Sequence, residues 1–149
     1  MRIYPTVVLR GTALQQMMEA GSYVPQSVEQ AVDLCAGLYE QFQAAGIPVI
    51  RLGLNPTELL SAGEAVAGAY HPALGELVLS EVYLRRARGL FGQVRPGQRV
   101  VLEVHPSRVS VMVGQKRRNL TALREEFSLG GIKVAASARE LWEITLKKE

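Results

Sequence analysis

Two apolar runs in the first third of the chain lack the alternation of a half-exposed strand. The first is RIYPTVVLRGT at residues 2–12, and the second is IPVIRLGL at residues 47–54. Such runs are typical of strands that are buried on both faces of a parallel sheet. Pro5 cannot donate a hydrogen bond to a sheet ladder, so it belongs near the beginning of its strand. We therefore predict strands at residues 3–10 and 47–54.

The segment between these strands has the signals of two helices. Thr12-Ala13-Leu14-Gln15 and Ser27-Val28-Glu29-Gln30 each match a capping box, and Gly21 and Gly46 are placed to end the helices. In the second helix the apolar residues that recur at helical spacing are Val28, Ala31, Val32, Cys35, Leu38, Tyr39 and Phe42. The order strand, helix, strand indicates a parallel crossover.

Two parallel strands leave their faces and edges uncovered. We therefore expect this segment to be the end of a larger α/β domain whose earlier strands lie outside the chain. Unpaired strand edges recruit partners, so we expect another copy of the chain, or strands from its C-terminal part, to pair with residues 3–10 and 47–54.

The pattern of the remaining residues predicts a smaller α+β part. Glycines and prolines mark residues 55–73 as a long loop, and a helix is expected at 74–88. A hairpin is expected from strands at 100–104 and 109–113 joined by His105-Pro106-Ser107-Arg108. Further elements are a helix at 119–127 and a strand at 132–135. Residues 141–146 could form a helix or a strand, and the alternation of Trp142, Ile144 and Leu146 favours a strand. The predicted domains are 1–88, a linker at 89–98 and a ββαβ domain at 99–149.

Charge is divided unevenly between the two halves. Residues 1–74 hold 3 Lys and Arg against 6 Asp and Glu, a net charge of −3, whereas residues 75–149 hold 14 against 8, a net charge of +6. This asymmetry predicts an anionic partner, such as RNA, for the second half. The sequence shows no membrane-spanning run and no secretory leader, so we expect a cytoplasmic protein.

The ends of the two predicted strands offer polar groups for a ligand, because ligands bind at the carboxyl ends of parallel strands. Gly11 and Gly53 would let the backbone approach a ligand, and Arg10 and Arg51 could meet a carboxylate or phosphate. In the alternative interpretation the glycines only turn the chain and the arginines face solvent.

Three stretches carry a resemblance to a known family: RIYPTVVLRGTAL, PVIRLGLNPTE and GAYHPALGELV. Together they resemble the later part of radical S-adenosylmethionine proteins, closest to the Elongator catalytic-subunit-like group and to oxygen-independent coproporphyrinogen oxidases. The resemblance covers about residues 2–88. It implies the fifth and sixth strands of an open parallel βα barrel, with Arg10, Thr12, Arg51 and Gly53 on the S-adenosylmethionine side.

In that family the complete protein holds a [4Fe–4S] cluster and S-adenosylmethionine, and the cluster loop carries three closely spaced cysteines. Cys35 is the single cysteine of this chain and it falls on the apolar stripe of a predicted helix. We therefore expect no cofactor and no metal in this chain, and a buried, inert thiol at Cys35.

Two polar side chains near residue 72 are candidate substrate contacts. His71 could act as an acid, a base or a polar contact, and Glu76 could assist it. The alternative is structural: His71 braces the entry of the helix that follows, and Glu76 complements its N-terminal dipole.

Residues 113–120, VGQKRRNL, are the strongest candidate for nucleic-acid binding. Gly114 is followed by Lys116, Arg117 and Arg118 at a helix start, where free N–H groups and cations attract phosphate. The stretch resembles the clamp of a KH RNA-binding module. It departs from that clamp because Arg117 stands in place of the second glycine and because no helix is expected before Gly114. A solvated basic turn is the alternative interpretation.

Taken together, these features predict the C-terminal part of a radical S-adenosylmethionine enzyme whose substrate is RNA or another anion. The chain would supply a barrel wall and a basic accessory domain. The alternatives are a stand-alone RNA-binding module and a protein-interaction module, neither of which is an enzyme.

Overall fold

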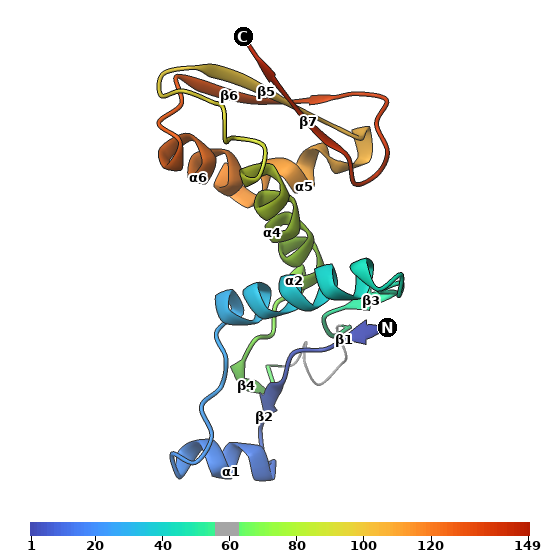
Figure 1. The fold of residues 1–149 in the computed structure, drawn as a ribbon. Coiled ribbons are helices and arrows are strands. Elements are labelled where there is room, and N and C mark those ends of the chain that lie inside the picture. The colour runs from blue at the N-terminus through green and yellow to red at the C-terminus, as the bar shows by residue number, and fades with distance from the viewer. Residues whose placement is uncertain (56–62) are drawn as a thin grey trace. The chain divides into compact units, whose positions relative to one another are not determined.

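The computed structural model describes residues 1–55 and 63–149, which form two compact units, Met1–Val78 and Leu79–Glu149. Figure 1 shows the helices and strands along the chain. The first unit contains β1 (Arg2–Ile3), β2 (Val7–Leu9), α1 (Ala13–Glu19), α2 (Val28–Ala44), β3 (Arg51–Leu52) and β4 (Ala65–Gly68). Helix α4 (Leu74–Arg88) begins in the first unit and ends in the second. The second unit continues with β5 (Arg99–Val104), α5 (Val109–Val113), α6 (Arg118–Glu126), β6 (Gly131–Ala136) and β7 (Ile144–Lys148).

The two predicted strands of the first unit are present, but they are shorter than expected. β1 pairs in parallel with β3, with Arg2 opposite Arg51 and Ile3 opposite Leu52, which confirms the predicted parallel pairing. The first strand is interrupted around the buried Pro5, because proline has no N–H for the ladder. Beyond this interruption the chain continues as β2, in a separate sheet.

The prediction of a loop at residues 55–73 is wrong in part. Residues 56–62 lie outside the described residues, but β4 follows them and pairs antiparallel with β2. The sequence of β4 is Ala-Val-Ala-Gly, and alanine and glycine are depleted in strands, so the pattern did not indicate one. Gly68 lies beside the β2 backbone, where an added Cβ would be 2.8 Å from the Thr6 carbonyl oxygen.

The helix-start signals are confirmed. The Ser27 hydroxyl accepts a hydrogen bond from the Gln30 N–H, and the Gln30 side chain accepts one from the Ser27 N–H, so the capping box is complete. At α1 the Gln15 side chain reaches the N–H of Gly11 instead of that of Thr12. α2 buries Ala31, Val32, Cys35, Ala36 and Tyr39, whereas α1 buries none of its side chains.

The two units divide inside α4, between Val78 and Leu79, and not in the predicted linker at residues 89–98. The later part of α4 and the loop after it belong to the second unit because their side chains enter its core. The buried residues of that core are Tyr83, Leu84, Ala87, Phe91, Val100, Leu102, Val104, Val111, Met112, Leu120, Leu123, Leu129 and Ile132.

The predicted hairpin and the ββαβ order of the second unit are wrong. Residues 109–113 form α5, and β5 pairs in parallel with β6 and antiparallel with β7. The strand order is β6-β5-β7, and Figure 1 shows α5 and α6 on one face of this sheet. The predicted helix at 119–127 and the predicted strand at 132–135 are confirmed as α6 and β6, within one residue at each end of either element.

The turn that leads into β6 depends on one glycine. A Cβ added to Gly130 would lie 2.3 Å from the carbonyl oxygen of Gly97, whereas a Cβ added to Gly92 would meet no atom within 4 Å. Hydrogen bonds hold this turn on either side: Gly97 N–H donates to Ser128 O and Gly130 N–H donates to Gln98 O.

We predict that Gly130→Ala lowers the free energy of unfolding by about 1–3 kcal/mol, because the backbone of Gly97 must move. The matched control Gly92→Ala should change it by less than about 0.5 kcal/mol. Urea denaturation of both variants measures the difference. Equal stabilities of the two variants would contradict this packing of the turn.

Candidate nucleic-acid interface

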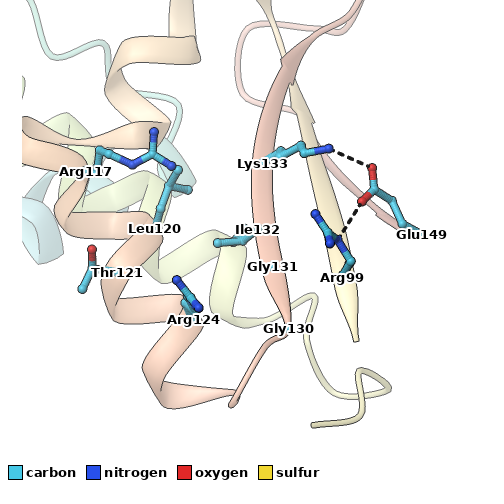
Figure 2. Close-up of a pocket in the computed structure, with 10 residues that line it drawn as sticks. All are labelled: Arg99, Arg117, Leu120, Thr121, Arg124, Gly130, Gly131, Ile132, Lys133 and Glu149. Atoms are coloured by element: carbon cyan, nitrogen blue, oxygen red, sulfur yellow. Dashed lines mark ion pairs between the residues drawn. The ribbon is translucent and has the colours of Figure 1, made fainter. Parts of the chain in front are cut away.

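A groove of 330 Å³ runs between α6 and the beginning of β6 in the second unit (Figure 2). Its α6 side holds Arg117, Leu120, Thr121 and Arg124. Its strand side holds Arg99, Gly130, Gly131, Ile132, Lys133 and Glu149. Leu120 and Ile132 lie at the floor of the groove and are almost fully buried, so only small parts of these two apolar side chains are open to a ligand there.

Cations dominate the groove, and they fall into two groups. Arg99 Nε lies 3.6 Å from one Glu149 carboxylate oxygen, and Lys133 Nζ lies 3.5 Å from the other. Figure 2 shows these side chains extending toward Glu149, beyond the strands as seen from α6. Within residues 1–55 and 63–149, neither Arg117 nor Arg124 has an ion-pair partner. The α6 side of the groove therefore offers uncompensated positive charge.

The predicted clamp, which consists of Gly114, Lys116, Arg117 and Arg118, lies at one end of this groove. Gly114 follows α5 directly, so the expectation that no helix precedes it is wrong. Gly114 has φ +74°, and Lys116 and Arg117 have φ values of 50° and 61° in the left-handed region. Lys116, Arg117 and Arg118 are all exposed. Arg117, which stands where the clamp would have its second glycine, thus adopts a backbone conformation that favours glycine.

The structure links the clamp and the groove through Arg117, which belongs to both. Sequence reasoning missed the groove residues Arg99, Arg124 and Lys133. The spacing of Leu120 and Arg124 was an available signal, because residues four apart lie on the same side of a helix. Lys133 could not be placed from sequence, since the groove exists only because β6 lies beside α6.

Arg10 and Thr12, which were predicted to line the cofactor side of a barrel, have local roles at the end of β2. Arg10 is exposed, and its Nε lies 3.5 Å from a carboxylate oxygen of Glu64. The Thr12 hydroxyl donates to Leu9 O at 2.7 Å and accepts from Gln15 N–H at 3.3 Å. Thr12 is therefore the N-cap of α1.

Arg51 and Gly53 belong to the other sheet of the first unit. Arg51 is exposed in β3, and Gly53 follows it with φ +78°. A Cβ on Gly53 would lie 3.2 Å from the Cβ of Leu74, so this glycine allows the close approach of α4.

His71 and Glu76 both lie at the beginning of α4. The His71 Nδ1 accepts a hydrogen bond from the Ala73 N–H at 3.1 Å, which braces the helix entry. Glu76 is exposed in the first helical turn. These positions match the structural alternative given for the two residues.

The family of the chain follows from comparison with known proteins. A model of the radical SAM C-terminal domain matches residues 1–84, more than half of the chain. The chain belongs to this family. Comparisons with curated proteins and with solved structures gave no significant match. Residues 85–149, which include the clamp and the groove, lie outside the family match.

Membership in the radical SAM C-terminal domain family implies a parent enzyme that uses a [4Fe–4S] cluster and S-adenosylmethionine. An iron–sulfur cluster requires several cysteine thiolates as ligands. Cys35 is the only cysteine of this chain, so its residues do not fit the cluster. Cys35 is 3% exposed, and burial raises the pKa of its thiol, so the iron-binding thiolate is disfavoured. No group of three or more His, Cys, Asp or Glu is placed to hold a metal within the described part of the chain. No helix in that part is long and apolar enough to cross a membrane.

We predict that anaerobic incubation of the chain with iron and sulfide yields no cluster, since one buried thiol cannot replace the family's cysteine loop. Visible absorption spectra after desalting should show no charge-transfer band. A stoichiometric cluster that disappears in Cys35→Ala would contradict this conclusion.

Proposed function

We propose that this chain is the C-terminal part of an RNA-modifying radical SAM enzyme of the Elongator-like and coproporphyrinogen oxidase-like group. In this proposal residues 1–78 supply part of the barrel wall, and residues 79–149 bind the RNA. The complete enzyme carries the cluster and S-adenosylmethionine elsewhere. Among the described residues β1 and β3 pair only with each other, and we propose that their outer edges pair with strands from other parts of the enzyme or from a second copy.

The groove between α6 and β6 is the observation that carries the RNA proposal. It combines the apolar residues Leu120 and Ile132 at its floor with Arg117 and Arg124, which have no ion-pair partner in the part of the chain that the structure describes. Apolar surface suits the faces of unstacked bases, and arginine suits phosphate. A duplex hides its base faces, so we propose that the ligand is a single strand.

The clamp supports the same proposal. A short loop with left-handed residues joins α5 to α6, as expected of a KH-like module, and it presents Lys116, Arg117 and Arg118 to solvent. α6 begins at this end of the loop, where the helix dipole favours an anion. The likeness to a KH module concerns only this loop and the two helices that flank it.

Protein interaction without catalysis is the rival function. A basic surface also attracts acidic proteins, but it does not need a groove with an apolar floor. RNA binding that is specific for single strands separates the two functions.

We predict that replacing Lys116, Arg117 and Arg118 together by alanine weakens binding to a short single-stranded RNA and flattens its salt dependence. Each phosphate contact contributes about 0.7 to the log–log slope for single strands, so three lost contacts reduce the slope by roughly two. Fluorescence anisotropy at several salt concentrations measures this.

The control is Arg95→Ala, which removes an exposed cation that does not line this groove. It should leave the salt slope unchanged. Thermal unfolding should be similar for both proteins, because exposed side chains outside the core contribute within about 0.5 kcal/mol each. If wild type and the triple variant gave superimposable titrations, RNA contact at this loop would be excluded.

A further inference from the structure

We propose that Asn119 is a positioning residue: it holds the clamp loop, residues 114–117, in its left-handed shape without contacting the ligand. The proposal rests on the proposed function of the clamp in RNA binding. It deepens that function by naming the buried group on which the geometry of the clamp depends.

Asn119 is a buried polar residue at the beginning of α6, with 2% of its surface exposed. Its amide Nδ2 donates to Ser80 O at 2.9 Å and to Ser80 Oγ at 3.0 Å, and it lies 3.4 Å from Val111 O. Ser80 belongs to α4 and Val111 to α5. One amide group therefore joins three helices beneath the loop.

Gly114, the first residue of the loop, is packed directly against this amide. A Cβ added to Gly114 would lie 3.1 Å from the Cγ and the Oδ1 of Asn119, and 3.1 Å from the Oγ of Ser80. The loop thus begins in contact with Asn119 and ends one residue before α6, the helix that carries Asn119. Gly114 at the start of the loop is therefore packed against this buried group, while the end of the loop is connected to it through α6, the helix that carries Asn119.

The middle of the loop needs such support. Lys116 and Arg117 have positive φ values, which cost free energy for residues that carry a Cβ. Conformations of this kind persist only where the surrounding structure fixes them. Neither side chain has a partner within the described residues that would hold it, so the loop is held by its own hydrogen bond from Arg117 N–H to Gly114 O and by the packing of Gly114 against Asn119.

A fixed loop presents its cations and the N–H groups of α6 in one arrangement before the ligand arrives. Preorganisation of this kind increases affinity, because less conformational freedom is lost on binding. Loss of the Asn119 hydrogen bonds should therefore weaken RNA binding, although no charged side chain is removed.

The test begins with Asn119→Leu, which has the same branching and number of side-chain heavy atoms but is bulkier and cannot form the hydrogen bonds. We expect its affinity for a short single-stranded RNA to fall about tenfold, with an unchanged salt slope because every cation remains. Measurements are made at a temperature at which circular dichroism shows both proteins fully folded. Wild-type affinity under these conditions would overturn the proposal.

A double-mutant cycle separates positioning from a merely structural role. Glycine adopts positive φ without strain, so Lys116→Gly with Arg117→Gly removes the strain that Asn119 holds. This background also lacks two cations of the loop, so its own affinity, lower than that of wild type, is the reference for the comparison. In that background Asn119→Leu should weaken binding by less than about twofold. Equal effects of Asn119→Leu in both backgrounds would show that it does not act through the loop.

Ser80→Ala keeps the test decisive if Asn119→Leu does not fold. It removes one acceptor of the Asn119 amide and the atom beneath Gly114, at a buried position on α4 that cannot reach the ligand. We expect Ser80→Ala to lower the affinity for RNA about threefold, and an unchanged affinity would overturn the proposal.

If wild type itself binds no RNA, the proposed function fails. If wild type binds and these variants bind equally well, only the role of Asn119 fails.

Discussion

The parallel pairing of β5 with β6 determines the architecture of the second unit. Parallel neighbours cannot be joined by a tight turn, so the chain between them must cross over, and here α5 and α6 form the crossover. The loop between these two helices holds the clamp, and the return of the chain as β6 forms the wall of the groove opposite α6. The same pairing therefore creates both parts of the candidate interface.

The chemistry of the interface follows from this arrangement. Leu120 and Leu123 of α6 are buried in the core, whereas Arg117 and Arg124 line the groove. The strand cations Arg99 and Lys133 both pair with Glu149, so the groove cations without an ion-pair partner among the described residues, Arg117 and Arg124, lie on the helix side. A strand of RNA lying in the groove would meet arginine on one side and apolar surface below.

Local signals in the sequence predicted local structure well. The capping box at Ser27 gave the start of α2, and the parallel pairing of β1 with β3 followed from the crossover pattern. Residues 109–113, Val-Ser-Val-Met-Val, are rich in β-branched valine as a strand is, yet they form α5, since a short apolar run does not distinguish a strand from a buried helix. The pairing of β5 with β6, which are far apart in the sequence, decides between a strand and a helix at residues 109–113. For the same reason the basic loop was predictable, but the groove beside it was not.

The central claim is that single-stranded RNA binds in the groove between α6 and β6, and backbone amide NMR tests it most directly. Titration of the ¹⁵N-labelled chain with a short single-stranded RNA should shift the amides of residues 114–118, Arg124 and residues 130–133. The amides of α2 in the first unit should not move, and a duplex of the same sequence should produce weaker changes. Shifts confined to the first unit, or the absence of any shift at saturating RNA, would contradict the account.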